Sequence, residues 1–83
     1  MFDHPKYVVI EDRTCEVPII LSCITDHATV VGQYKVVSAG FVSLGINAHR
    51  ITASCWGEST SLKGIKSRGE EDARLIERML NEE

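Results

Sequence analysis

Residues 53–69 read ASCWGESTSLKGIKSRG and lead into a strongly patterned segment that runs to Glu83. The stretch starts with strand-like residues, passes through a polar loop rich in Gly, Ser and Lys, and ends where a helix is expected to begin. Many phosphate sites are built in that order, because the first backbone N–H groups of a helix are free to bind an anion. The stretch therefore predicts where the last strand ends and where the last helix begins. It also suggests nucleotide binding as a hypothesis.

The loop lacks the specific pattern of a nucleotide-binding P-loop. That pattern needs Gly, four residues, and then Gly-Lys-Ser/Thr. Here Leu62 replaces a glycine whose backbone must approach phosphate, and Gly64 replaces the metal-binding hydroxyl. We therefore do not expect nucleotide hydrolysis. Binding of a nucleic acid or another anion at the helix start stays open as an alternative. It would use the side chains of Lys63, Lys66, Ser67 and Arg68.

The segment after the loop has the pattern of an amphipathic helix. Its apolar residues recur at helical spacing, at Ala73, Ile76, Met79 and Leu80, with Leu75 on the flank. Ser67 and Glu70 are three residues apart, which predicts a capping box and a helix that begins near Ser67. The apolar stripe predicts that this helix packs across one face of a sheet.

The first half of the chain predicts a β-hairpin. Lys6–Glu11 and Cys15–Ser22 have the β-branched and aromatic content of strands, and residues 12–14 supply a turn. Pro18 cannot donate a ladder hydrogen bond, which places the second strand at a sheet edge or puts a bulge there. Residues 26–31, ended by Gly32, fit either a short helix or a loop, and both remain open.

A second hairpin is expected from residues 35–44 and 50–56, around a turn at 45–47. The length of the turn decides which side chains share a face, since a slip of one residue reverses them all. A three-residue turn would group Val37, Ala39 and Phe41 with Ile51, Ala53 and Cys55. A two-residue turn would group Val36, Ser38, Gly40 and Val42 with the same second set. The first grouping is more apolar, and we prefer it.

With the preferred register, Trp56 lies opposite Cys55 on the sheet face away from the core. The apolar side chains expected to join it there are Val36, Val42 and Leu44. Trp commonly anchors interfaces, although a neighbouring loop or residues 26–31 would equally cover it. A chain this short with a single long helix cannot cover both faces of a sheet. We therefore expect a protein partner, either a second copy in a homodimer or another protein.

Four residues raise the alternative of a metal site. These residues are Cys23, His27, His49 and Cys55. They could surround one ion if the second hairpin lay near residues 23–27. Paired Cys-x2-Cys spacing is absent from the sequence, and small buried positions suit the cysteines equally well. A cysteine nucleophile would need a base, an orienting group and a cleft. We expect no metal, no cofactor and no enzymatic activity.

Composition and length predict one small α+β domain over residues 1–83. Its expected architecture is an antiparallel sheet of about four strands in two hairpins, with the C-terminal helix on one face. Apolar residues make up 43% and charged residues 25% of the 83, as in soluble globular proteins. No apolar run has the length of a membrane span, and the start has no signal-peptide pattern. A net charge of −3 disfavours extensive nucleic-acid binding, and three cysteines without a paired pattern favour a cytoplasmic location.

Three short motifs give the chain a resemblance to a known group. They are Ser38-Ala39-Gly40-Phe41, residues 57–62, and Ser67-Arg68 with Glu71-Asp72. They resemble small uncharacterised proteins encoded by tailed phages and prophages, over residues 38–80. The resemblance implies a phage-related or bacterial cytoplasmic accessory protein, and it implies no activity, cofactor or site residue. Together with the composition, it leads us to expect a non-enzymatic interaction or assembly module.

Overall fold

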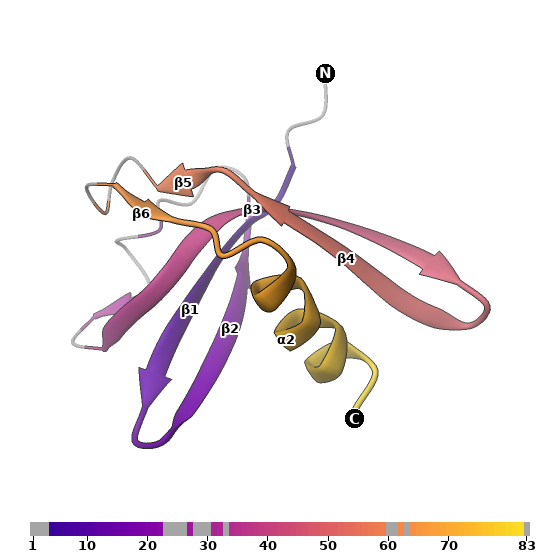
Figure 1. Ribbon diagram of the computed structural model, residues 1–83, viewed down its shortest axis with the longest axis horizontal. Helices are drawn as coiled ribbons and strands as arrows, with labels where there is room; N and C mark the ends of the chain where they lie inside the picture. The colour runs from indigo at the N-terminus through magenta and orange to yellow at the C-terminus, as the bar shows by residue number, and fades with distance from the viewer. Residues whose placement is uncertain are drawn as a thin grey trace.

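A computed structural model describes residues 4–22, 27, 31–32, 34–59, 62 and 64–82. Four strands form an antiparallel sheet in the order β2-β1-β3-β4: β1 (Lys6–Asp12), β2 (Cys15–Leu21), β3 (Lys35–Asn47) and β4 (Arg50–Trp56). A two-stranded sheet of β5 (Glu58–Ser59) and β6 (Ile65–Lys66) follows, and then the helix α2 (Glu70–Leu80) (Figure 1). The predicted α+β class, with a four-stranded sheet and a packed C-terminal helix, is confirmed. Among the described residues, no helix combines the length and the apolar character needed to cross a membrane.

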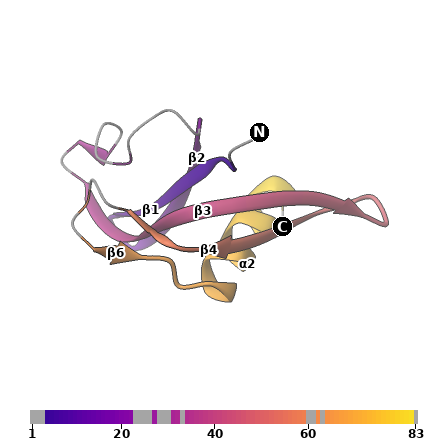
Figure 2. The ribbon, with the colours of Figure 1, turned by 90° about the horizontal axis from the view of Figure 1, so that it is seen from above.

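β3 pairs with different neighbours along its two halves. Residues 35–41 form a ladder with β1, residues 41–47 form one with β4, and the two ladders overlap at Phe41. The two hairpins therefore diverge from this point, and α2 lies between them (Figure 1). Seen from above, the end of the β3–β4 hairpin projects past the helix (Figure 2). The end of the β3–β4 hairpin thus forms an arm, which extends beyond the centre of the sheet.

The first hairpin agrees with the sequence prediction. β1 and β2 are joined by a two-residue turn, Arg13–Thr14, in which Arg13 has a positive φ of 61°. β2 lies at the edge of the sheet, as Pro18 predicted. In the range 26–31, His27 and Val31 have helical backbone, and the other residues lie outside the described part of the chain.

The turn of the second hairpin differs from the prediction. It is formed by Ala48 and His49, with positive φ values of 52° and 68°, and β3 continues through residues 45–47. Two consecutive positive φ values are typical of the tight turn whose twist suits a β-hairpin. The resulting register pairs Val42 with Cys55. The preferred three-residue grouping is therefore wrong. The two-residue grouping occurs for Ser38, Gly40 and Val42, whereas the register shift between Val9 and Ile10 puts Val36 on the opposite face.

Apolar side chains fill both faces of the sheet near β1. On the α2 side, the fully buried residues are Tyr7, Val9, Val42 and Ile76, and Leu75 and Leu80 pack against them. On the opposite side, the buried residues are Val8, Ile10, Val31 and Ala39, and Val36, Leu62 and Ile65 pack against them. The helix therefore covers one face, and residues from the loops and β6 cover the other.

The start of α2 also differs from the prediction. Glu70 is the first helical residue, Gly69 is the N-cap with a positive φ of 62°, and no side chain caps from that position. The Oγ of Ser67 accepts a hydrogen bond from the Gly69 N–H at 2.9 Å. The carboxylate of Asp72 reaches back to the Arg68 N–H at 2.8 Å. The predicted capping box between Ser67 and Glu70 is wrong, because Asp72 caps the backbone that precedes the helix.

The last turns of α2 cover the free edge of β4. The side-chain amide of Asn81 accepts from the N–H of Ile51 and donates to its C=O, both at 2.9 Å. The carboxylate of Glu77 accepts from the Ala53 N–H at 2.8 Å. These side chains replace the backbone of a neighbouring strand and protect this edge from pairing with another chain.

Candidate functional site

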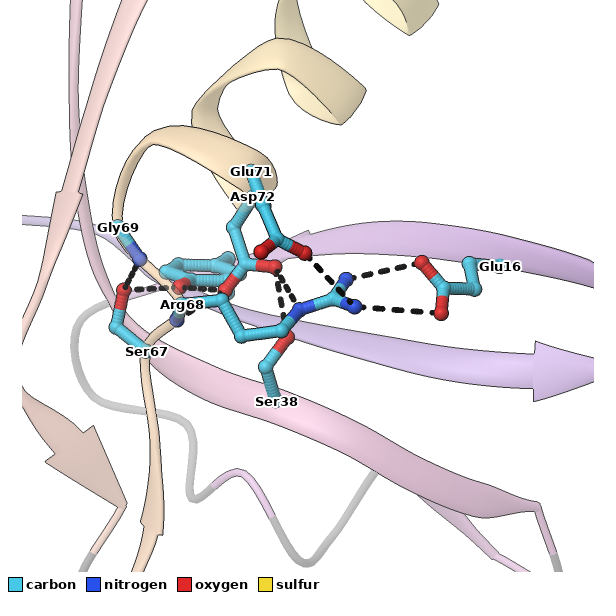
Figure 3. Close-up of polar contacts among 8 residues, drawn as sticks. Glu16, Ser38, Ser67, Arg68, Gly69, Glu71 and Asp72 are labelled. Atoms are coloured by element: carbon cyan, nitrogen blue, oxygen red, sulfur yellow. Dashed lines mark hydrogen bonds and ion pairs between the residues drawn. The ribbon is translucent and has the colours of Figure 1, made fainter.

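The polar side chains that join α2 to the sheet gather around Asp72 (Figure 3). This carboxylate is fully buried, and each oxygen accepts two hydrogen bonds. Oδ2 accepts from the Tyr7 hydroxyl and from the Arg68 N–H. Oδ1 accepts from the Ser38 hydroxyl at 2.9 Å and from Arg68 Nε at 2.8 Å. The acceptor positions of the carboxylate are therefore filled from within the chain.

A second layer of contacts surrounds the Asp72 carboxylate. The Oγ of Ser67 lies 2.6 Å from the Tyr7 oxygen. Because the one phenolic hydrogen goes to Asp72, Ser67 donates to Tyr7. The two terminal nitrogens of Arg68 bond to the carboxylate of Glu16 at 3.0 and 3.3 Å, and Glu71 lies 3.6 Å from the same guanidinium. This cluster, which we call the Asp72 network, joins α2 to β1, β2 and β3.

Burial and hydrogen bonding act in opposite directions on Asp72. Burial alone would raise the pKa of its carboxyl, but the hydrogen bonds, led by that from Tyr7, outweigh burial and hold the pKa below its usual value. Burial, and then the bond to Asp72, raise the pKa of Tyr7 far above its ordinary range. The pair therefore keeps an ionised carboxylate and a neutral phenol at neutral pH. A buried carboxylate with its acceptor positions filled is suited to hold two layers together rather than to reach a substrate proton.

The residues predicted for anion binding are divided by the fold. Lys63 lies outside the described residues, and Lys66 is exposed on β6. Ser67 and Arg68 belong to the Asp72 network. The guanidinium of Arg68 faces three carboxylates, those of Glu16, Glu71 and Asp72. The positive charge needed for anion binding is thus neutralised within the chain at this residue.

Of the residues predicted as a metal alternative, the three that the structure describes, His27, His49 and Cys55, lie apart. Cys23 lies outside the described residues, and buried His27 has its Nε2 3.0 Å from the Gly40 carbonyl oxygen. His49 is exposed in the turn at the end of the arm, whereas Cys55 lies on the α2 side of the sheet. In the described ranges, no three potential ligands form a cluster. Burial raises the pKa of the Cys55 thiol to about 11, so this thiol stays protonated at neutral pH.

The four residues predicted to form one interaction surface lie on two faces. On the face away from α2, Trp56 is 40% exposed and stacks on Phe41 with ring centroids 6.3 Å apart. Val36 packs into the apolar cluster on that same side. Val42 is fully buried under α2, and Leu44 lies further along that side. The prediction of a common face is wrong, because the two-residue turn puts Val42 and Leu44 on the face opposite Trp56, and the register shift between Val9 and Ile10 returns only Val36 to the side of Trp56.

A shallow apolar groove lies at the projecting end of the arm. Its volume is about 340 Å³, and its lining residues are Leu44, Gly45, Ile46, Ile51 and Leu80. Ile46 is 82% exposed and Leu44 is 43% exposed. Sequence reasoning missed Ile46, because it placed residues 45–47 in a turn, and it assigned Ile51 and Leu80 to apolar faces without joining them to Leu44. The signal that could have found them is the alternation of Leu44, Ile46 and Ile51 on one face of a longer hairpin.

The same part of β3 has a free backbone edge. The ladder with β1 ends at the pair of Lys6 and Phe41, and the Val42 N–H then bonds to the Pro5 carbonyl at 2.9 Å. Backbone groups alternate in direction along an antiparallel strand. The N–H and C=O groups of Leu44 and Ile46 therefore point to the same side as those of Val42, away from β4. Within the described part of the chain, no strand pairs with Leu44 or Ile46 on that side.

Comparison of the chain with protein-family models, with curated proteins and with solved structures gives no match. The groove, the edge of β3 and the Asp72 network are therefore the features of the described residues that bear on function.

Replacing Asp72 with Asn tests the Asp72 network, because the change keeps the shape of the side chain and removes its charge. The partly buried charge of Arg68 then loses its closest partner, and an amide nitrogen faces hydrogen-bond donors. We expect a loss of about 3 kcal/mol or more in the free energy of unfolding, measured with urea at neutral pH. Tyr7→Phe, which removes the hydrogen bonds of the phenol with Asp72 and Ser67, should cost about 1–3 kcal/mol. Asp12→Asn at the exposed end of β1 is the control, and an equal effect of D12N and D72N would contradict the role of the network.

The lowered pKa of Asp72 predicts a pH dependence of stability. Its contribution is complete above the unfolded pKa of about 3.9 and is lost as the pH falls through the lower pKa of the folded protein. The free energy of unfolding should therefore fall more steeply with decreasing pH in the wild type than in Asp72→Asn below about pH 4. Urea midpoints measured along an acid pH series check this, and parallel profiles of the two proteins would contradict it.

Proposed function

We propose that the protein is a non-enzymatic interaction module that assembles through the projecting end of the β3–β4 hairpin. The observation that supports this most directly is the exposure of Ile46, at 82%, beside Leu44 in an apolar groove. The partner that fits this surface is a second copy of the chain, which would make the protein a homodimer. The resemblance of the sequence to small phage and prophage proteins supports an accessory role in the bacterial cytoplasm.

Burial of the arm on a partner supplies the driving force. Transfer of one such aliphatic side chain out of water is worth about 1.5–3 kcal/mol. Leu44 and Ile46 lie on a paired strand that the β4 ladder holds in place. Little conformational entropy is then lost when they dock, since the arm is already ordered. A preformed apolar surface of this kind favours binding over catalysis.

Nucleic-acid or anion binding has less support. It depends on cationic side chains at the start of α2, and Arg68 there already pairs with carboxylates on both sides. An overall charge of −3 also lacks the excess of cations that phosphate contacts need. The arm, by contrast, presents apolar side chains that have no role in the buried clusters around Tyr7 and Val8.

Ile46→Lys tests the proposed function. We expect the mass of the wild type, measured by light scattering in a concentration series, to rise towards that of two chains. The Ile46→Lys protein should keep the mass of one chain at every concentration. At protein concentrations low enough for the wild type to be a single chain, its urea midpoint should equal that of the wild type, because the side chain is mostly exposed before association.

Two further variants serve as controls for this experiment. Val17→Lys changes a 37% exposed apolar residue on β2, at the other side of the sheet, and should associate as the wild type does. Trp56→Ala removes the aromatic ring on the face away from α2. The proposal is overturned if the wild type stays monomeric throughout, or if Trp56→Ala abolishes association while Ile46→Lys retains it.

A further inference from the structure

We propose that two copies of the chain join β3 to β3 in an antiparallel ladder centred on Gly45. The two four-stranded sheets would then form one continuous sheet with both helices on the same face. This inference rests on the proposed function and names the partner and the way it binds. The feature that carries it is the coincidence of a free backbone edge and exposed apolar side chains at Leu44 and Ile46.

The other two lateral edges of the described sheet are poorly suited to pairing. The edge of β4 is occupied by the side chains of Glu77 and Asn81. Pro18 of β2 has no N–H group. In a strand that is paired on one side, a proline lies where its N–H would point away from the partner strand, so the donor is missing on the outer side of β2. A strand added to β2 would therefore lose a hydrogen bond in the middle of its ladder. The free part of β3 carries no proline, and no side chain of the described residues is bonded to its edge.

The free groups select one register. A two-fold axis at Gly45 brings Leu44 opposite the partner's Ile46, and each such pair can exchange both of its N–H···O=C bonds. An axis at Leu44 would place Ile46 opposite the partner's Val42, whose N–H is already bonded to Pro5. An axis at Ile46 would place Leu44 opposite Ala48, which lies in the turn with a positive φ. The Gly45 register uses both free residues of each copy, and its ladder is limited to the two pairs of Leu44 with Ile46, because Pro5 already fills the position opposite Val42.

Side chains and charges are compatible with this register. Leu44 and the partner's Ile46 would lie side by side on the α2 face and extend the groove across the axis. On the other face the two Gly45 residues would meet without side chains. Residues 43–47 contain no charged side chain, so two copies of a chain with a net charge of −3 do not repel each other along the pairing line.

Cysteine cross-linking tests the register. In the Gly45 register, Ser43 lies opposite the partner's Asn47 in a pair without mutual hydrogen bonds, at a separation that a disulfide spans. Ser43→Cys and Asn47→Cys are prepared with Cys15→Ser and Cys23→Ser, and Cys55 is retained because its protonated thiol oxidises slowly. After mild oxidation, a mixture of the two variants should form a covalent dimer that a thiol reductant reverses. Each variant alone should form little of it.

Hydrogen exchange gives a second measurement without any substitution. Among the described residues, the amides of Leu44 and Ile46 have no hydrogen-bond partner, and they should exchange about tenfold more slowly at high protein concentration than at low concentration. The Val42 amide, which is bonded to Pro5, is the internal control and should change little.

The outcomes separate this inference from the proposed function. If Ile46→Lys blocks association but the mixed variants do not cross-link and the Leu44 and Ile46 amides stay unprotected, the module associates in another way and edge pairing is overturned. Equal cross-linking of Ser43→Cys alone would indicate a different register and would also overturn it. If the wild type does not associate at all, both the inference and the proposed function fail.

Discussion

The buried carboxylate of Asp72 is the interaction on which the rest of the structure depends. An unpaired charge in the interior would strongly destabilise the fold, so its position is acceptable only where donors surround it. Those donors come from β1, from β3 and from the residue before Gly69. Because they belong to three segments that are far apart in the sequence, the carboxylate accepts only one orientation of α2 on the sheet. The hydrogen bonds to Asp72 therefore fix where α2 begins on the sheet. The direction and the length of the helix then fix where it ends.

The location of α2 determines what remains uncovered. With 11 residues, the helix is about 16 Å long, whereas the 13 residues of β3 extend over about 43 Å. A helix that starts at the Asp72 network and crosses to β4 can cover the centre of the sheet and one edge. Its last residues reach the outer edge of β4 at Ile51, and Leu80 lines one side of the groove, but they leave Leu44 and Ile46 exposed. The exposure of Ile46 is therefore a geometric consequence of a long strand paired with a short helix.

Alternation of apolar residues and the position of Pro18 were enough to predict the four strands and the place of β2, since these signals are local. The turn at Ala48 and His49 carries no Gly or Asn, while the sequence Gly45-Ile46-Asn47 resembles a turn and lies inside a strand. The turn was therefore predicted at the wrong residues, and this error assigned Val42 and Leu44 to the wrong face of the sheet.

The start of α2 was mispredicted for a related reason. The spacing of Ser67 and Glu70 fits a local capping box, but Ser67 is engaged by Tyr7, 60 residues away in the sequence. The partner that determines the role of Ser67 could not be identified from nearby residues. For the same reason the sequence indicated Asp72 only as one of several acidic residues suited to the first turn of a helix, and its burial was not foreseen.

An uncovered strand edge beside exposed apolar side chains is a hazard for a soluble protein, and natural sheets commonly block such edges with proline, lysine or an added segment. This chain uses two of these solutions, with Pro18 on β2 and the side chains of Glu77 and Asn81 on β4. Residues 43–47 show neither a proline nor a charge. Within the described residues two edges are protected and a third is not, and for that third edge we propose a second copy of the chain as the cover.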